Sequence, residues 1–295
     1  MTSESRKVNL FVLGAMRAGT TSFMEFIGKH PAIYTSPIKE PHFFTESLPK
    51  EIFEALPTNH LKHYFKKEFP KPIHRAHVTA IEEYQKLFKN ATNQKYLAEG
   101  SVSYLHAPHV ASELQHYNPE AKIIIVTRDP LERAVSHYHM NVGLFREKRS
   151  FEAALQSEIE AYHKNELPWY SYLNMSFYKA TISNYRQHFG DTILVISLED
   201  LVENTEKTST QVSTFLEICP FETQALPALN KNKRLRFKKV FGVLHYLKLK
   251  EILFSIVPST RKSSVKNIFL SDCENEVKMS TELRKTLLAI FQKEC

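Results

Sequence analysis

The chain has 295 residues, 42% of them hydrophobic, which is enough to bury the core of one large domain. Three scattered cysteines argue against a disulfide framework and favour a reducing compartment. No stretch approaches the ~18 uninterrupted apolar residues of a membrane-spanning helix, and no apolar leader precedes the first strand. We therefore expect a cytoplasmic protein without a transmembrane segment. The formal net charge is +7, with many of the basic residues gathered in residues 231–266.

The first predicted element is a strand near residues 9–13, followed by a loop and a helix. The loop runs from Gly14 to Ser22 with the sequence GAMRAGTTS, and the helix-like stretch Phe23–Ile27 comes next. Backbone N–H groups of such a loop and the positive end of the helix point at one spot. The segment therefore predicts a cradle for a phosphate-like anion.

This loop departs from the ATP-binding pattern G-x-x-x-x-G-K-[ST], in which a lysine after the second glycine reaches the β- and γ-phosphates. Here that position is Thr20, and the basic residue, Arg17, lies inside the loop. The change disfavours a triphosphate with magnesium and favours a shorter 5′ anion. A P-loop nucleotide kinase or nucleoside triphosphatase is the alternative, and a glycine turn without any ligand would give the same local pattern.

Five strand-like runs alternate with helical patterns along the chain. Such alternation indicates βαβ crossovers and ligand binding at the carboxyl edge of the sheet. We predict an α/β, P-loop-type three-layer fold with a mostly parallel central sheet of about five strands and helices on both faces. The expected core covers residues 8–218, and a basic helical segment covers about 230–295. The strand-like runs lie near residues 9–13, 32–35, 95–99, 122–127 and 192–197.

A second anion site is predicted where the fourth of these strands ends. The strand leads into Arg128-Asp129-Pro130, and a proline suits the first turn of a helix. Ser136 lies eight residues past Arg128, far enough along that helix to face the same crevice. An arginine and a serine hydroxyl suit a phosphate monoester, whereas Arg133 is expected in a surface ion pair. Two such sites on neighbouring strand ends describe a nucleotide phosphorylated at both its 5′ and 3′ positions.

The pairing of a loop G-x-x-[KR]-x-G-T-[ST] with a strand-borne R-[DN]-P-x-x-R-x-x-S resembles the sulfotransferases that use 3′-phosphoadenosine 5′-phosphosulfate (PAPS). The chain is most similar to soluble bacterial sulfotransferases and to the sulfotransferase domains that modify heparan sulfate. The match runs from about residue 8 to residue 218 and implies one sulfotransferase domain over residues 1–295. Further segments in family-like order are His30-Pro31, Lys39-Glu40-Pro41-His42-Phe43-Phe44, residues 98–104, Ser176-Phe177-Tyr178 and Leu198-Glu199-Asp200-Leu201.

The resemblance implies PAPS as co-substrate and 3′-phosphoadenosine 5′-phosphate (PAP) as product. Arg17 stands where the family usually has lysine, and we expect it to stabilise the charge that grows on the leaving phosphate. Tyr178 is either a nucleotide contact or a core tyrosine, and Arg234 is a further candidate cofactor contact. The residues expected to bind the nucleotide are Arg17, Ala18, Gly19, Thr20, Thr21, Ser22, Arg128, Ser136, Tyr178 and Arg234.

Glu40 is the candidate general base, because its segment resembles the N-E-x-H-F-F stretch of the glycan 3-O-sulfotransferases. We expect partial burial to raise its pKa. A structural carboxylate is the alternative. His42 either orients Glu40 or acts as the base, and His42 and Glu99 are expected near the acceptor. The lysine that follows this glutamate in the glycan enzymes is Gly100 here, which puts a glycan acceptor in doubt.

The acceptor is not defined by the sequence. A hydroxyl or an amine of a small molecule, lipid or carbohydrate would serve, and Trp169, Tyr170 and Tyr172 either line its pocket or pack in the core. The basic stretch 231–266 is predicted to cover the sheet or to contact a membrane surface. We expect no nucleic-acid partner and no metal, since the H-x-x-H pairs at 60–63 and 74–77 lack an evident further ligand. The oligomeric state stays open.

Overall fold

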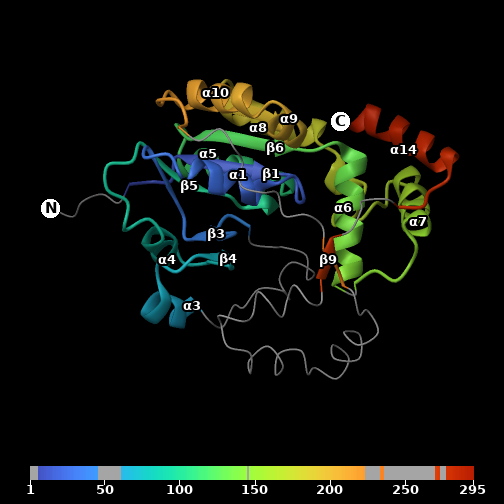
Figure 1. The fold of residues 1–295 in the computed structure, drawn as a ribbon, viewed down its shortest axis with the longest axis horizontal. Helices are drawn as coiled ribbons and strands as arrows, with labels where there is room; N and C mark the ends of the chain where they lie inside the picture. The colour runs from blue at the N-terminus through green and yellow to red at the C-terminus, as the bar shows by residue number, and fades with distance from the viewer. Residues whose placement is uncertain (1–5, 46–60, 145, 223–232, 236–269, 273–276) are drawn as a thin grey trace.

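The computed structural model describes residues 6–45, 61–144, 146–222, 233–235, 270–272 and 277–295 (Figure 1). Within these residues the main sheet has five parallel strands in the order β2-β5-β1-β6-β7. All five predicted strands form this sheet, so the predicted mostly parallel α/β fold is confirmed. The strands are β1 (Leu10–Gly14), β2 (Ile33–Thr35), β5 (Tyr96–Glu99), β6 (Lys122–Thr127) and β7 (Ile193–Ser197).

The centre of the sheet is the most deeply buried part of the chain. Every residue of β1 is buried, as are the four central residues of β6, because helices cover both faces of a parallel sheet. From β1 the chain goes to β2 and β5 on one side, and later to β6 and β7 on the other. The strand β1 therefore lies at the switch point of the topology, where ligands of open α/β sheets bind beyond the carboxyl ends of the strands.

Helices surround the sheet, and α6 begins at Pro130, where the sequence predicts the first turn of a helix. The Asp129 side chain accepts a hydrogen bond from the backbone N of Glu132 (2.9 Å), and Pro130 occupies the first turn of α6. Ser280 caps α14 in the same way. The α-helices are α1 (Thr20–Ile27), α3 (Leu61–His63), α4 (Ile81–Lys86), α5 (Val110–Tyr117), α6 (Pro130–Gly143), α7 (Phe151–His163), α8 (Lys179–Phe189), α9 (Leu198–Glu203), α10 (Thr205–Leu216) and α14 (Thr281–Glu294). Short turns of other helix types cover Tyr64–Glu68, Val102–His106 and Asn174–Ser176.

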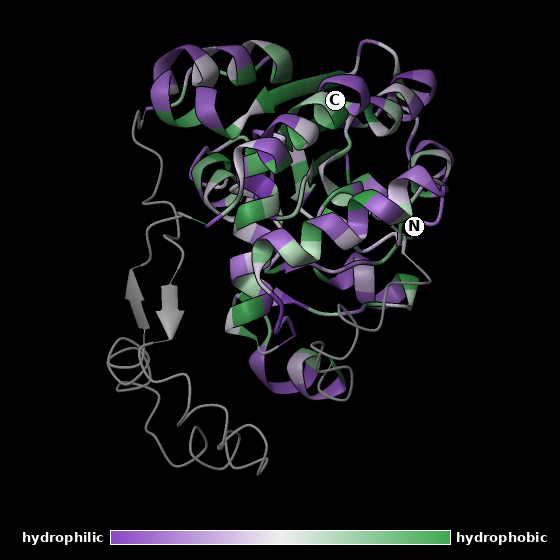
Figure 2. Ribbon diagram, turned by 90° about the vertical axis from the view of Figure 1, so that its right-hand side faces the viewer, coloured by the Kyte–Doolittle hydropathy of each residue, from purple (hydrophilic) through white to green (hydrophobic). Residues whose placement is uncertain are grey.

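A second hydrophobic cluster lies beside the sheet core. It joins α6, α7 and α14, which Figure 1 shows together at one end of the molecule. In Figure 2 these and the other helices carry both hydrophobic and hydrophilic residues, as expected when one face of each helix packs on a core. The clustered side chains include Leu131, Val135, Phe151, Leu155, Leu173, Leu287 and Phe291.

A small parallel sheet was not predicted from the sequence. It pairs β3 (Ile38–Glu40) with β4 (Ile73–Arg75) and lies apart from the main sheet in Figure 1. Each strand has only three residues, too few for an alternating pattern to be recognised. The backbone N of Gly100, just after β5, donates to the carbonyl O of Lys39 (3.0 Å) and ties β3 to the main sheet. The pair of strands thereby holds the predicted base segment beside the loop that follows β1.

Most of the basic stretch 231–266 lies outside the described residues. Of this stretch only β8 (Lys233–Leu235) is described, and it pairs antiparallel with β9 (Leu270–Asp272). The predicted roles of the stretch, on the sheet or on a membrane surface, therefore stay predictions. No helix in the part of the chain that the structure describes is long and apolar enough to span a membrane.

Gly14, the last residue of β1, makes a close backbone approach to α1. A Cβ atom at this position would lie 2.1 Å from Cγ2 of Thr20, far inside van der Waals contact. We expect Gly14→Ala to lower the free energy of unfolding by about 1–3 kcal/mol, because either the loop or the Thr20 side chain must move. Urea denaturation of the purified chain measures this loss.

Two matched variants separate this clash from a general effect of alanine. Thr20→Ser removes the Cγ2 methyl group, so the double variant Gly14→Ala/Thr20→Ser should recover most of the lost stability. Gly143→Ala, at a helical position where the new Cβ would meet no described atom within 4 Å apart from its chain neighbours and the backbone of its own helix, should be neutral or slightly stabilising. A double variant as unstable as Gly14→Ala alone would show that the methyl contact is not the cause.

Candidate active site

The loop between β1 and α1 has the tight geometry of an anion cradle. The backbone N of Ala15 donates to the carbonyl O of Val126 on β6 (2.9 Å), and that of Ala18 donates to Ala15 (2.9 Å). Arg17 and Gly19 both adopt positive φ angles, 77° and 78°. This conformation is costly for an arginine, and such residues cluster at functional sites. The turn directs the N-terminal end of α1, where backbone N–H groups lack intrahelical acceptors, toward the carboxyl edge of the sheet.

Three predicted nucleotide-binding residues meet at this loop. The Nε of Arg17 donates to the Ser136 hydroxyl on α6 (3.0 Å), and Nη1 of Arg128 donates to the carbonyl O of Arg17 (3.3 Å). Arg128 also pairs with Glu132 one helical turn further on (3.3 Å). Burial and the nearby Arg128 lower the pKa of Arg17, although a guanidinium stays protonated at neutral pH. The structure therefore places two cations and one hydroxyl around the cradle.

Lys39 is a third cation at the loop, and sequence reasoning gave it no role. Its Nζ donates to Oγ1 of Thr20 (3.0 Å) and to Oε1 of Glu40 (2.6 Å). The side chain is only 12% exposed, so the ion pair with Glu40 is shielded from water. The ammonium thereby joins the anion cradle directly to the predicted base. The only sequence signal was its place beside Glu40 in the family-like segment.

The pKa of Glu40 shifts opposite to the prediction. Burial does favour the neutral carboxyl, but Lys39, His42 and His74 outweigh it and hold the pKa below its usual range. His42 Nε2 lies 3.5 Å from one carboxylate oxygen, and His74 Nε2 lies 3.8 Å from the other. The expected raised pKa is wrong because Lys39, which precedes Glu40 on the same strand, places its ammonium against the carboxylate. Glu40 is therefore ionised at neutral pH, as a proton acceptor must be.

His42 is held in a fixed orientation next to Glu40. Its backbone has a φ of 53°, its N–H donates to the Ser101 hydroxyl (3.0 Å), and its Nδ1 lies 2.7 Å from the Ser103 hydroxyl. Ser101 in turn donates to Oε2 of Glu99 (2.7 Å). The structure thus brings Glu40, His42 and Glu99 into one connected group, with His42 oriented by the segment after β5.

Glu99 is fully buried at the end of β5. Its oxygens accept hydrogen bonds from the Tyr84 hydroxyl (2.9 Å) and from Ser101. Burial is the largest influence and raises its pKa to about 7, against the lowering effect of these hydrogen bonds. A direct contact of Glu99 with the acceptor stays a prediction, because its described partners are groups of the protein itself.

The expected surface ion pair of Arg133 is wrong. Arg133 is 0% exposed, and burial lowers its pKa to about 10. Its Nε donates to the Ser176 hydroxyl (2.6 Å) and its Nη2 to the carbonyl O of Tyr172 (2.7 Å). The segment that covers it lies some forty residues further along the chain, so local sequence gave no sign of burial. Arg133 therefore anchors the segment 172–176 onto α6.

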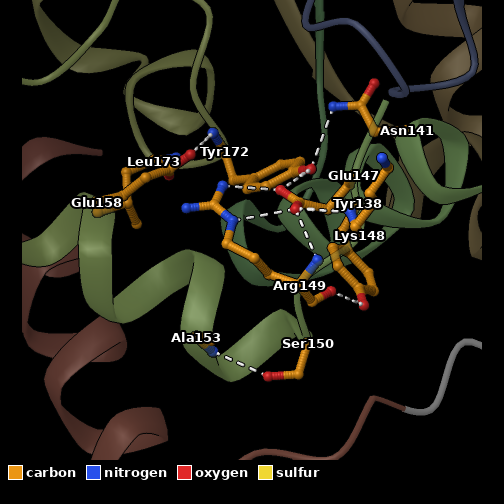
Figure 3. A network of polar contacts seen from close by, with 10 residues as sticks. All are labelled: Tyr138, Asn141, Glu147, Lys148, Arg149, Ser150, Ala153, Glu158, Tyr172 and Leu173. Carbon is orange, nitrogen blue, oxygen red and sulfur yellow. Dashed lines mark hydrogen bonds and ion pairs between the residues drawn. The ribbon is translucent and has the colours of Figure 1, made fainter. Parts of the chain in front are cut away.

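Figure 3 shows how the same segment is held from its other side. Both carboxylate oxygens of Glu158 on α7 accept from backbone N–H groups, those of Tyr172 and Leu173 (2.9 Å each). The Tyr172 hydroxyl accepts from Asn141 (3.2 Å) and donates to Glu147 (3.3 Å). Tyr172 is consequently a core residue, as one of the two predicted interpretations has it.

The fixed segment carries Trp169 and Tyr170 to the anion loop. The Tyr170 hydroxyl lies 3.9 Å from the sulfur of Met16, and its ring contacts His137 edge to face (4.9 Å between centroids). The Trp169 indole N–H donates to the carbonyl O of His106 (2.6 Å). Both rings are half-buried. They thus lie between η3 (Val102–His106) and the loop, and their contact with an acceptor stays a prediction.

The remaining predicted residues are placed as follows. Ala18 is buried in the loop, and Thr20 and Ser22 are buried at the start of α1. Tyr178 is 5% exposed, as in the alternative of a core tyrosine. Arg234 lies in β8, and its contact with the nucleotide stays a prediction. Among the described residues no group of three or more His, Cys, Asp or Glu could hold a metal ion.

Comparison with known proteins identifies the family of the chain. The model of the sulfotransferase family matches residues 9–222, so the chain belongs to that family. The membrane-associated sulfotransferase kil1 of Dictyostelium discoideum is 28% identical over 145 residues, which are 48% of this chain and 25% of that protein. Human heparan sulfate glucosamine 3-O-sulfotransferase 3B1 is 22% identical over 223 residues, covering 75% of this chain and 49% of the human protein.

The fold is also that of a solved sulfotransferase. The crystal structure of a sulfotransferase from Alicyclobacillus acidocaldarius aligns with a TM-score of 0.63 at 22% identity, covering 98% of this chain and 93% of that one. The resemblance noted from the sequence is thus confirmed at the level of family and fold. The chain spans a quarter to about half the length of the curated relatives described above.

The raised pKa of Glu99 makes the stability of the fold depend on pH. Between its ordinary value of 4.5 and about 7, the folded state holds a proton that the unfolded state has lost. Stability contributed by this proton is present below pH ~4.5 and is lost as the pH rises through about 7. Through this group the wild type should lose about 2–3 kcal/mol of its free energy of unfolding between pH 5 and pH 8. Glu99→Gln cannot titrate at this position, so its free energy of unfolding should fall by that much less over the same range.

Urea denaturation at the two pH values measures this difference. Glu82→Gln on α4, where the side chain is exposed, serves as the matched control and should retain the wild-type pH dependence. Equal pH dependence in Glu99→Gln and in the wild type would contradict the assignment of the proton to Glu99.

Proposed function

We propose that the chain transfers a sulfuryl group from PAPS to a hydroxyl or amine of an acceptor. The observation that carries this proposal is the convergence of three cations on one anion loop. Arg17 belongs to the loop, Lys39 reaches Thr20 from β3, and Arg128 reaches the Arg17 carbonyl from the end of β6. Family membership supports the same activity.

A nucleotide with phosphates at both ends of its ribose suits this arrangement. The loop and the start of α1 would hold the 5′-phosphosulfate, through Thr20, Thr21, Ser22 and backbone N–H groups. Arg128 and Ser136 would hold the 3′-phosphate, since both lie against Arg17 on the α6 side of the loop. PAP would remain bound as the product.

Sulfuryl transfer requires mainly that the acceptor is aligned with the sulfur and that the charge on the leaving phosphate is stabilised. We assign Glu40 as the base that takes the acceptor proton, and His42 as the residue that orients it. Arg17 stabilises the charge that develops on the leaving 5′-phosphate. Trp169 and Tyr170 would form a wall of the acceptor pocket. The acceptor is a small molecule, lipid or carbohydrate, and a cytoplasmic location stays a prediction.

The alternative of a P-loop kinase or triphosphatase finds less support in the residues. Such enzymes place a lysine after the second glycine and hold magnesium with a carboxylate at a strand end. Here Thr20 follows Gly19, and β6, directly beside β1, leads into Arg128. The carboxylate at the end of β5, Glu99, accepts from Tyr84 and Ser101. These features favour a donor that needs no magnesium bridge.

The 3′-phosphate assignment is tested by comparing PAP with AMP, which lacks that group. We expect the wild type to bind PAP more tightly than AMP. Arg128→Ala should weaken PAP binding about 10- to 100-fold and leave AMP within about twofold, because only PAP loses a charge-assisted hydrogen bond. Isothermal titration calorimetry gives both constants.

Arg186→Ala on α8 is the control, since it removes an exposed arginine from a surface away from the loop contacts. It should leave both affinities unchanged. Equal weakening of PAP and AMP by Arg128→Ala would place the 3′-phosphate elsewhere, and a wild type that binds no PAP would refute the proposed function.

A further inference from the structure

Lys39 occupies a position between the two halves of the proposed reaction. Thr20, at the start of α1, belongs to the donor side, and Glu40 belongs to the acceptor side. The Lys39 ammonium is hydrogen-bonded to both, at 3.0 and 2.6 Å. A group that passes from a donor held at Thr20 to an acceptor deprotonated by Glu40 must cross the space next to this ammonium.

The local fold is built to let the Lys39 side chain reach this position. Its carbonyl O is fixed by the backbone N of Gly100 (3.0 Å). A Cβ atom at Gly100 would lie 2.8 Å from the Met24 side chain and 3.5 Å from Cε of Lys39. A side chain at residue 100 would therefore clash with Met24 and would lie in van der Waals contact with Lys39. The glycine thus leaves room for Met24 beside the Lys39 side chain, which extends to Thr20.

The charge of the Lys39 ammonium and its number of hydrogen-bond donors suit a role in sulfuryl transfer. It has three donor hydrogens, and its contacts with Thr20 and Glu40 account for two. Nonbridging sulfuryl oxygens are anionic acceptors, and a shielded cation stabilises them more strongly than an exposed one. The Nε of Arg17 is directed to Ser136 on the α6 side, whereas the Lys39 ammonium lies on the Glu40 side.

We propose that Lys39 is a catalytic residue that contacts the oxygens of the transferring sulfuryl group, an inference that rests on the proposed PAPS-dependent function. In the transfer, the acceptor oxygen forms a bond to sulfur, and the sulfur–oxygen bond to the 5′-phosphate breaks. The electron pair of that bond stays on PAP, and the acceptor proton goes to Glu40.

The same ammonium controls the base. Lys39, His42 and His74 face Glu40 with positive or titratable groups, and Glu40 in turn helps to raise the pKa of the Glu99 carboxyl at the end of β5. When the sulfuryl oxygens draw the ammonium toward them, Glu40 loses part of its strongest counter-charge. Its affinity for a proton then rises at the moment when the acceptor must give one up.

Binding of PAP and PAPS to Lys39→Met tests the contact, because PAP lacks the sulfuryl group. We expect PAP affinity within about twofold of the wild type and PAPS affinity about 10- to 100-fold weaker. Hydrolysis of PAPS by water, followed as release of labelled sulfate, should also slow. Its acid limb should move to higher pH, because burial then dominates the pKa of Glu40.

Lys29→Met, an exposed lysine just past the end of α1, is the matched control and should leave both affinities unchanged. If Lys39→Met fails to fold, Lys39→Gln keeps a hydrogen-bond donor without the charge and is measured in the same way. Thermal melting followed by circular dichroism establishes that each variant is folded.

The outcomes separate the two proposals. A wild type that binds neither PAP nor PAPS defeats the proposed function itself. If the wild type binds both nucleotides and the Lys39 variant loses both affinities equally, Lys39 contacts a phosphate or has a structural role, and the proposed contact with the sulfuryl group is wrong. Unchanged PAPS affinity in that variant would also overturn the proposed contact.

Discussion

The tight turn between β1 and α1 is the constraint on which the site depends. Gly14 brings the end of the central strand against Thr20, and the positive φ angles of Arg17 and Gly19 let the chain reverse direction within a few residues. The turn sends the Arg17 side chain to α6 and the Thr20 hydroxyl to β3. One short loop thereby determines which side chains from the rest of the fold can meet around a bound anion.

Two separate supports complete the site around this turn. On one side, the small sheet of β3 and β4 presents Lys39 and Glu40, and the buried chain of Glu99, Ser101 and His42 fixes their surroundings. On the other side, buried hydrogen bonds from α6 and α7 hold the segment after α7 and with it Trp169 and Tyr170. The donor side and the acceptor side are thus carried by different parts of the fold. Their relative position is set by packing rather than by one continuous segment.

The sequence predicted the main sheet because its strands are apolar runs, and it predicted the cradle because loop and helix adjoin in the chain. It also placed Ser136 on the helix that follows Arg128, and both residues contact Arg17. Prediction from the sequence failed where burial or contacts depend on residues that the local pattern does not show. Arg133 is buried by a segment near residue 172, and the three-residue strand β3 carries no periodic signal. The pKa of Glu40 was predicted in the wrong direction because a neighbouring lysine turns back onto it.

The most direct measurement is transfer of label in the presence of a mixture of sugars, sterols, phenols and amines. The chain is incubated with sulfur-labelled PAPS and, separately, with γ-phosphate-labelled ATP and magnesium. We expect labelled product from PAPS alone, and its loss in Glu40→Gln by about 100-fold or more with PAP binding retained. Transfer from ATP, or failure to convert PAPS to PAP at all, would contradict the account.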